Sequence, residues 1–333
     1  MNDVIKLIHG DGGKHTKNLI EKFFYKYFNN DILLKEQDSG IFTAVKGKMA
    51  FTTDSFVVKP LFFSGGDIGK LAVYGTVNDL AVSGAKPLYL SASFIIEEGF
   101  SMQILEDIVK SMGKACLECG VKIVTGDTKV VEKGSADGIF INTSGIGYIT
   151  NGYEIKQIEA GDRIIVTGPI GEHGTTIAVE RYGLKIKGDF KSDCAPLYPF
   201  IEKLEEHFAS IKIMRDPTRG GLATVLHEFS SLCNIGIQLM EEEIAISENV
   251  KSINNLLGLE PLYMACEGRM VLVVKEFEAQ EVLKVIQSIE QGKGARIIGK
   301  FARDSNQNVL IENSFGGKRI LAPLDGNMVP RIC

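Results

Sequence analysis

The sequence predicts a two-domain α/β protein of the α+β type, with an N-terminal β-sheet covered by helices and a C-terminal mixed sheet with helices. The chain has 333 residues, which suits two domains of ordinary size better than one small core. Apolar residues make up 44% and charged residues 24%, values typical of a globular enzyme. Short β-branched runs alternate with apolar residues at helical spacing in both halves, which favours sheets packed against helices.

The turn-forming segment Thr150-Asn151-Gly152 marks the expected domain boundary. We expect an N-terminal domain at 1–150, an α/β domain at 151–325, and a mobile tail at 326–333 that ends in Cys333. A tail of this kind spans about 30 Å when extended, enough to carry the thiol from a domain surface into a cleft. A frayed end with an accidental cysteine is the alternative.

Composition excludes several classes of protein. The net charge of -5 argues against a nucleic-acid partner, which requires a basic face. No run of 18 apolar residues and no export signal at Met1 appear, so we expect no membrane partner and a cytoplasmic protein. The six cysteines are scattered, and the pair Cys116 and Cys119 lacks a second ligand pair for zinc. Cys116 continues an apolar helical stripe, which favours core packing.

The first half contains several acidic or glycine-rich loops. A glycine-rich turn at 10–13 leads into a helix from about Lys14 to Asn29, and its backbone could face phosphate. Strands are predicted at 41–45 and 49–53, with Asp38 before this pair and Asp54 directly after it. Carboxylates at strand ends point into loops, where hard oxygen ligands gather for Mg²⁺. A turn-forming role is the alternative for each.

A glycine loop at Gly65-Gly66 opens a helix that carries Asn78 and Asp79. Asp67 suits the helix N-cap. Asp79 has no capping role, and its burial in an apolar stretch would be costly unless a cation met it. Farther on, strand 121–125 is expected to stop at Gly126-Asp127-Thr128-Lys129, which places a carboxylate and an ammonium at its tip. A surface ion pair is the alternative there.

The second half adds three more polar features. His173 follows a predicted strand at 163–167 and is interpreted as a hydrogen-bonding loop residue. Asp216 and Arg219 stand before a helix beside Gly220-Gly221, so Asp216 caps the helix or binds a ligand, and Arg219 suits phosphate. Glu267 precedes a predicted strand at 270–274, where it either accepts a proton or pairs with Arg269.

Together these segments resemble a family of ATP-binding enzymes. The matching blocks are His9-Gly10 to Gly13, Gly65 to Leu80, Gly126 to Lys129, Asp216 to Gly221, Ala265 to Gly268, and the final Pro330-Arg331-Ile332-Cys333. They are similar to aminoimidazole ribonucleotide synthetase, selenophosphate synthetase and thiamin-phosphate kinase. Within that superfamily the terminal four residues resemble the HypE family of NiFe hydrogenase maturation proteins, described as carbamoyl dehydratases. Ala245 departs from this pattern, where a proline is expected.

The resemblance implies a cytoplasmic homodimer whose N-terminal sheets pair into a barrel, with ATP and Mg²⁺ between domains. It implies that the carbamoyltransferase HypF places a carbamoyl group on Cys333. ATP then phosphorylates the carboxamide oxygen, and loss of phosphate leaves a thiocyanate. The cyanide passes to iron on the HypC–HypD complex, while ATP becomes ADP and phosphate.

The resemblance also assigns roles to residues. Cys333 carries the reacting group, Lys129 polarises the carboxamide oxygen, and Glu267 takes an amide proton. Gly65, Gly66, Asn78, Thr128 and Arg219 join the nucleotide site. The expected metal and phosphate ligands are Asp38, Asp54, Asp79, Asp127 and Asp216, because phosphoryl transfer depends on positioning and charge neutralisation.

Two rival functions remain open from the sequence. One is an ATP-dependent enzyme acting on a free small molecule such as aminoimidazole ribonucleotide or selenide. Selenophosphate synthetases carry a reactive cysteine in the N-terminal glycine-rich segment, whereas the first cysteine here is Cys116. The other is a non-catalytic scaffold that carries the modified cysteine to its acceptor.

Overall fold

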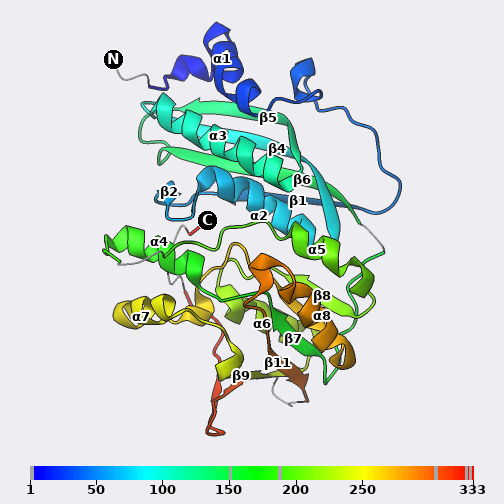
Figure 1. The fold of residues 1–333 in the computed structure, drawn as a ribbon. Helices are drawn as coiled ribbons and strands as arrows, with labels where there is room; N and C mark the ends of the chain where they lie inside the picture. The colour runs from blue at the N-terminus through cyan, green and yellow to red at the C-terminus, as the bar shows by residue number, and fades with distance from the viewer. Residues whose placement is uncertain (1–3, 150–151, 187–189, 304–306, 327–328, 330–331) are drawn as a thin grey trace.

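A computed structural model describes residues 4–149, 152–186, 190–303, 307–326, 329 and 332–333. The expected boundary at Thr150 and Asn151 lies outside these residues, as do Pro330 and Arg331 of the tail motif. Figure 1 shows two layered α/β halves, with the end of the chain between them.

The N-terminal half is built on a four-stranded sheet of order β1-β6-β4-β5. β4 and β5 are parallel, and the other neighbouring strands are antiparallel. The strands span Met49–Phe56 (β1), Ala85–Glu97 (β4), Lys122–Val131 (β5) and Ile139–Ile149 (β6). Helices α2 (Ile68–Val82) and α3 (Met102–Cys119) cover one face of this sheet (Figure 1).

The caps of these helices follow from local chemistry. The Asp67 carboxylate accepts from the backbone N–H groups of Gly69 and Lys70, which confirms its N-cap role in α2. The Ser101 hydroxyl does the same for α3. Cys116 is buried in the α3 core stripe, as predicted.

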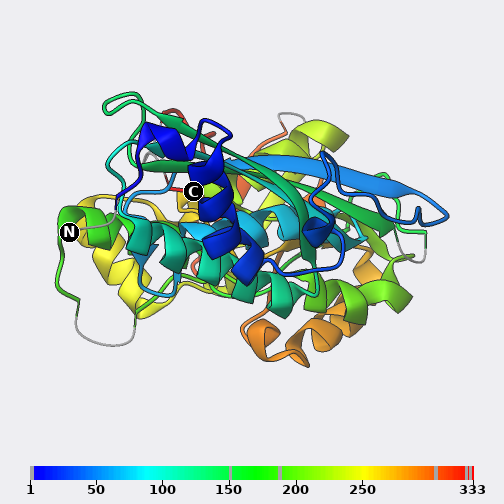
Figure 2. The same ribbon diagram turned by 90° about the horizontal axis from the view of Figure 1, so that it is seen from above.

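The segment before β1 lies beside β5, at the edge of the sheet farthest from the C-terminal half (Figures 1 and 2). Its elements are η1 (Leu7–His9), α1 (Lys14–Leu19), the π-helical turn η2 (Ile20–Tyr25) and η3 (Leu33–Lys35). A two-residue hairpin, β2 (Phe62–Phe63) with β3 (Gly66–Asp67), leads into α2.

The C-terminal half is built on a seven-stranded mixed sheet of order β13-β12-β9-β11-β7-β10-β8. Of its strand pairs in the described residues, only β12 and β9 run parallel. The strands span Arg163–Val166 (β7), Ile211–Arg215 (β8), Gly236–Met240 (β9), Val271–Val274 (β10), Arg296–Ala302 (β11), Val309–Glu312 (β12) and Lys318–Ile320 (β13).

Helices cover both faces of this sheet, because successive residues of its central strands point to opposite sides. On β7, Ile164 and Val166 pack with α6 (Gly221–Cys233), whereas Ile165 packs with α5 (Tyr198–Leu204) and α8 (Ala279–Gln287). Helices α4 (Glu172–Tyr182) and α7 (Glu248–Leu257) pack against each other. Short 3-10 turns complete the half at Glu205–His207, Glu241–Glu243, Pro261–Tyr263, Glu276–Glu278 and Glu290–Gly292.

Helix α2 joins the two halves. Its Ala81 and Val82 belong to the same buried cluster as α5 and α8 of the C-terminal sheet. The side chain of Asn78 donates to the carbonyls of Ala195 (3.1 Å) and Glu267 (3.1 Å). The carboxyl half of α2 is therefore fixed to loops of the other domain.

The structure corrects three strand predictions. Residues 41–45 form no strand. β1 continues through Asp54 to Phe56, because its pairing with β6 is unbroken from Met49 onwards. β5 continues through Asp127 to Val131, because Gly126 allows close approach to β4: an added Cβ would lie 2.3 Å from the Ala92 carbonyl oxygen. Asp54 and Asp127 therefore lie within strands and not at strand tips.

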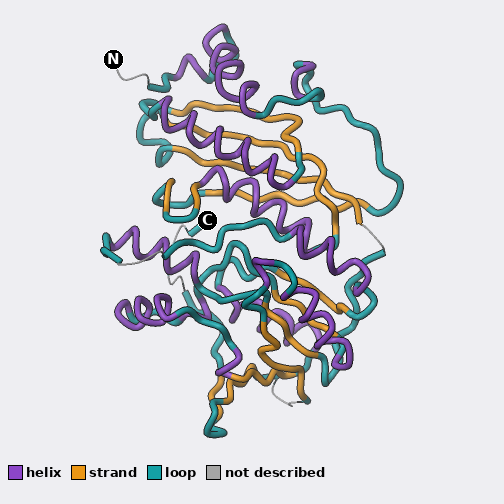
Figure 3. The backbone as a smooth tube through the Cα atoms, in the orientation of Figure 1, coloured by secondary structure: helices purple, strands orange, loops and turns teal. Residues whose placement is uncertain are grey.

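The α+β architecture with a sheet in each half is confirmed. In the part of the chain that the structure describes, no helix is both long enough and apolar enough to span a bilayer. Loops line the region between the two sheets where the chain ends (Figure 3).

Candidate active site

Cys333 lies between the two domains. The backbone N–H of Val57, just after β1, donates to the main-chain oxygen of Cys333 (3.0 Å). Burial raises the pKa of the Cys333 thiol to about 12, and the negative charges of Glu267 and Asp54 add to this rise. Arg219 opposes it. The thiol therefore stays protonated in this position at neutral pH.

Asp54 on β1 and Asp79 on α2 lie close to each other beneath the sheet. The hydroxyl of Thr52 donates to Asp79 Oδ2 (2.7 Å). A Cβ added to Gly75 would lie 2.8 Å from the Phe56 ring and 3.8 Å from Asp54 Oδ2, so this glycine leaves room for the ring next to the carboxylate. Burial raises the pKa of both carboxyls, and the charge of Asp54 raises that of Asp79 further.

Asp216 extends this acidic group from the other domain, between β8 and α6. Burial raises its pKa to about 7, with the charge of Asp79 as the second cause. Arg219 stands two residues before the start of α6 and is exposed. Its positive charge offsets part of the rise in the pKa of Asp54 and Asp79. The structure thus brings these predicted residues together in one site between the domains, which we call the cleft.

Glu267 is the most buried acid of the cleft, with 3% of its surface exposed. Its Oε1 has no hydrogen-bond partner. Burial, followed by the charge of Asp216, raises its pKa well above the ordinary value. Arg269 pairs with Glu172 (2.8 Å) and Asp193 (3.7 Å). The sequence left open whether Glu267 accepts a proton or pairs with Arg269. Arg269 pairs with Glu172 and Asp193 instead of Glu267.

The cleft fits a cation brought by a phosphate ligand. Its carboxyls raise one another's pKa, so positive charge there relieves repulsion. Within the described ranges, however, no three His, Cys, Asp or Glu side chains stand close enough together to hold a metal ion alone. Mg²⁺ bound to nucleotide phosphates needs only one or two carboxylates, and this is the arrangement that the cleft suits.

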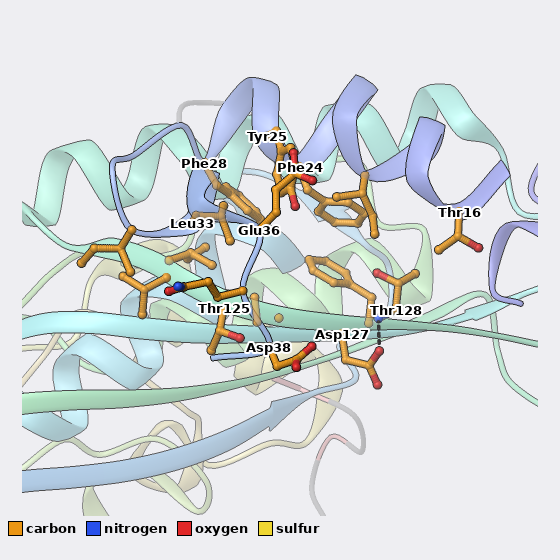
Figure 4. A pocket seen from close by; sticks show the side chains of 18 of the residues that line it. Thr16, Phe24, Tyr25, Phe28, Leu33, Glu36, Asp38, Thr125, Asp127 and Thr128 are labelled. Carbon is orange, nitrogen blue, oxygen red and sulfur yellow. Dashed lines mark hydrogen bonds between the residues drawn. The ribbon is translucent and has the colours of Figure 1, made fainter. Parts of the chain in front are cut away.

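The remaining predicted residues line a second pocket of about 560 Å³ beside β5. Figure 4 shows Asp38 and Asp127 on the same side of it. The backbone N–H of Thr128 donates to Asp127 Oδ1 (2.9 Å), and Lys129 Nζ lies 3.2 Å from the same oxygen. Gly10 and Gly12 of the N-terminal turn also line this pocket.

The sheet separates the two groups within one protomer. Asp127 pairs with Ser93 on β4, which pairs with Asn142 on β6, which in turn pairs with Ser55 on β1. Three strand spacings amount to about 14 Å. One ion therefore cannot contact Asp127 and Asp54 in the same protomer. Lys129 is not among the charges that shift the Cys333 pKa, so its place beside the tail stays a prediction.

The predicted glycines and Asn78 have structural contacts. Gly65 has φ +91°, and an added Cβ would lie 2.8 Å from the Ser192 carbonyl oxygen. A Cβ on Gly66 would lie 2.8 Å from the Phe63 ring. Both amide hydrogens of Asn78 are used between the domains, and its Oδ1 accepts from the Leu197 N–H (2.8 Å). Nucleotide binding by these three residues stays a prediction.

The sequence did not identify several residues of the cleft. Asp193 Oδ1 accepts the backbone N–H of Glu267 (3.1 Å) and so holds that loop. His173 is fully buried and contacts the carbonyl of Ile332 through Nε2 (2.7 Å). No local pattern links positions 159 residues apart. Gly174, next to His173, is a sequence signal of this contact, because a Cβ added to it would lie 3.2 Å from Ile332 Cδ1.

Two family models cover most of the chain. The AIR synthase related protein N-terminal domain matches residues 36–149, and the C-terminal domain of the same family matches residues 159–312. The carbamoyl dehydratase HypE of Rhizobium leguminosarum bv. viciae is 47% identical over 100% of this chain and 96% of that protein. The chain belongs to the HypE family of carbamoyl dehydratases. The HypE of Escherichia coli (strain K12) is 41% identical, with 99% of each chain covered.

Solved structures of HypE share the fold. HypE in complex with ATP matches with a TM-score of 0.93 and 41% identity over 98% of this chain and 99% of that one. A HypE–HypF complex matches with a TM-score of 0.81 and 47% identity over 92% and 99% of the two chains. Thiamine monophosphate kinase from Aquifex aeolicus, at 13% identity and a TM-score of 0.60, shares the fold alone.

Proposed function

We propose that this protein uses Mg·ATP to dehydrate a carbamoyl group carried on its own Cys333. The carboxamide oxygen of the S-carbamoyl cysteine attacks the γ-phosphorus, and the bond to ADP breaks. The O-phosphorylated imidate then loses phosphate with its remaining N–H proton and becomes a thiocyanate. The carboxamide oxygen leaves in phosphate, and both amide protons are released.

The position of the Cys333 sulfur beside the unpartnered Glu267 carboxyl carries this proposal. Burial, with the negative charge of the cleft as the second cause, keeps the docked thiol neutral, so the thiol is a poor nucleophile there. A neutral thiocarboxamide suits the same position, because it offers N–H donors to Glu267. Carbamoylation then takes place with the tail outside the cleft, on the partner enzyme.

The acids of the cleft have two roles in the proposed dehydration. Mg²⁺ bound with the nucleotide supplies the positive charge that lets the carboxyls ionise together. One or two of the carboxylates of Asp54, Asp79 and Asp216 would hold it, together with the nucleotide phosphates. Glu267 becomes a base once that charge lowers its pKa, and its Oε1 then accepts an amide proton. Arg219 is the exposed cation at the cleft that suits a phosphate oxygen.

A second copy of the chain completes the site in this proposal. The outer face of the N-terminal sheet exposes apolar side chains, with Phe51 70% and Met49 45% exposed. An apolar hollow of about 340 Å³ lies there, lined by Phe42, Val45 and Ile146 among others. Exposed apolar surface of this kind marks a protein interface. Pairing of two sheets into a barrel would cover it.

The partners follow from the same chemistry. HypF is the proposed source of the carbamoyl group, supported by the HypE–HypF complex among the matching structures. The HypC–HypD complex is the proposed acceptor of the cyanide. We place the reaction in the cytoplasm, where thiols stay reduced; all six cysteines of the chain are free, in agreement.

Mass spectrometry of the tail peptide tests the function. Protein carbamoylated by HypF is incubated with Mg·ATP, and the peptide that contains Cys333 is weighed. We expect a loss of one water, about 18 Da, together with one ADP per peptide. A scaffold that only carries the modified cysteine would leave the peptide mass unchanged, and that result would overturn the proposal.

A further inference from the structure

Two hydrogen bonds to main-chain oxygens hold the end of the chain, one from each domain. On the N-terminal side, the Val57 N–H donates to the main-chain oxygen of Cys333 (3.0 Å). On the C-terminal side, His173 Nε2 lies 2.7 Å from the Ile332 carbonyl oxygen. His173 is the second residue of α4, after the left-handed turn at Gly171. Main-chain oxygens on both sides of the Cys333 Cα therefore accept a hydrogen bond.

The tautomer of His173 follows from its partners. A carbonyl oxygen only accepts, so Nε2 carries the hydrogen. Nδ1 is then the acceptor, and it lies 2.8 Å from the hydroxyl of Ser192. Ser192 Oγ in turn accepts the Cys194 backbone N–H (3.1 Å). This chain of bonds fixes one ring orientation, with the single N–H of His173 aimed at the tail.

The ring is also fixed by packing. His173 is fully buried, and the edge of the Phe63 ring meets it at a centroid distance of 5.3 Å. The Ile332 side chain packs against the N-terminal core cluster. An added Cβ at Gly174 would lie 3.2 Å from Ile332 Cδ1, so the glycine next to His173 leaves room for that side chain. The last two residues are therefore half-buried in a site shaped to fit them, called the seat below.

We propose that His173, oriented by Ser192, is a positioning residue that seats the Ile332-Cys333 peptide so that the sulfur meets Glu267 and the acidic cleft. This inference rests on the proposed function, in which Cys333 carries the reacting carboxamide. The neighbouring Asp193 holds the Glu267 backbone, so one short segment, Ser192 to Cys194, supports both the seat and the base. A displacement of about 1 Å at a reacting group costs about 100-fold in rate.

Alkylation of Cys333 tests the seat without any catalysis. The docked thiol has a pKa of about 12, whereas a released one has its ordinary value of about 8.5, so reagent captures the released tail. His173→Leu removes the donor, and we expect iodoacetamide to modify Cys333 about five to ten times faster at pH 8, measured on the tail peptide. His173→Gln retains a side-chain N–H in a similar place and should return the rate to within about twofold of the original.

Single-turnover dehydration of carbamoylated protein tests the catalytic consequence. At saturating Mg·ATP, His173→Leu should slow the loss of water about 10- to 100-fold, and His173→Gln should recover most of the rate. The ATP concentration at half-maximal rate should not change, because His173 contacts the tail, Ser192 and Phe63 and not the carboxyls of the cleft. A merely structural role would lower both variants equally.

Controls separate this inference from instability and from the proposed function. His227 on α6 is a partly buried histidine whose Nε2 has no hydrogen-bond partner, and His227→Leu should leave Cys333 alkylation unchanged. If His173→Leu fails to fold, Ser192→Ala, which removes only the orienting hydroxyl, should still raise alkylation severalfold. Unchanged alkylation in both variants overturns the seat. Faster alkylation with no dehydration in the original protein overturns the proposed function alone.

Discussion

Two acidic regions of this protein use the same residue type in opposite ways. In the cleft between the domains, Asp54, Asp79 and Asp216 are partly or largely buried, and burial raises their pKa values. In the pocket beside β5, Asp127 is exposed and pairs with Lys129 at 3.2 Å. The carboxyls of the first region have too little positive charge near them, whereas the Asp127 carboxylate of the second region is paired with Lys129.

This difference in burial and charge pairing indicates which region suits a positively charged ligand. Buried carboxyls that repel one another cost folding free energy, and a protein retains them where function requires them. An exposed ion pair contributes about 0–1 kcal/mol and requires no ligand. The cleft is also the region that receives Cys333, which is why we place the proposed chemistry there.

Removal of the sulfur should have the largest effect. Cys333→Ala leaves every cleft acid in place, so we expect Mg·ATP affinity within about twofold of the original but no thiocyanate at all. Calorimetry measures the first and mass spectrometry the second. Cys119→Ala, at a partly exposed cysteine of α3, is the control and should keep full activity. Cyanide delivery by Cys333→Ala would show that the cleft does not act on this thiol.

Mixed dimers test whether the two regions meet across protomers. Cys333→Ala and Asp127→Asn should each be inactive alone. If Asp127 of one copy serves Cys333 of the other, co-expression restores one working site in each mixed dimer. About a quarter of the original activity per site is then expected, because half of the dimers are mixed. Activity that stays at zero would place both residues of each working site in the same protomer.

Sequence reasoning found the cleft residues but not their arrangement. Asp54 and Asp127 both look like strand-end residues, yet each lies inside a strand whose partner continues past it. Strand length here is set by β6 and β4, which are distant in sequence, so local patterns mislead. Asp67 shows the opposite case: its capping role depends on the next three residues, and the prediction is confirmed.

The same limit explains His173. Its neighbours in sequence indicate only a turn into a helix, and its contacts with Ser192 and Ile332 are made by the fold. Gly65 shows the same limit. A Cβ added there would lie closest to the backbone of Ser192, a contact that its sequence neighbours do not indicate, and its nucleotide binding stays a prediction. The local sequence therefore could not predict the long-range contacts that hold the tail.

The stored charge of the cleft predicts an unusual pH dependence. The pKa of Asp216 is about 7 in the folded state and about 3.9 in an unfolded chain, so the folded state binds its proton more tightly. Its contribution to stability is fully present below about pH 4 and is lost as pH rises to about 7. Asp216→Asn should therefore flatten this decline and raise the free energy of unfolding at pH 8 by about 2 kcal/mol.

Urea unfolding between pH 5 and pH 8 without divalent ions measures this change. Added Mg·ATP should stabilise the original protein and have less effect on Asp216→Asn, since the variant has less negative charge to neutralise. Asp31→Asn is the control, because Asp31 is an exposed surface residue whose pKa is lowered by Lys122. Parallel stability curves for the original protein and Asp216→Asn would contradict the charge imbalance in the cleft.

The smallest expected effect on stability is at Lys129, where the balanced pocket should tolerate loss of its cation. Lys129 and Asp127 are 65% and 59% exposed, so Lys129→Ala should change the free energy of unfolding by less than about 0.5 kcal/mol. Lys122→Ala is a matched change, since Lys122 lies on the same strand and pairs with Asp31 at 2.7 Å. Both variants should unfold alike in urea, while only Lys129→Ala should slow dehydration, by about tenfold or more, because a lysine that polarises the carboxamide oxygen acts on the reaction and not on the fold. Equal activity of the two variants would confine Lys129 to a surface ion pair and leave the acidic cleft to act without it.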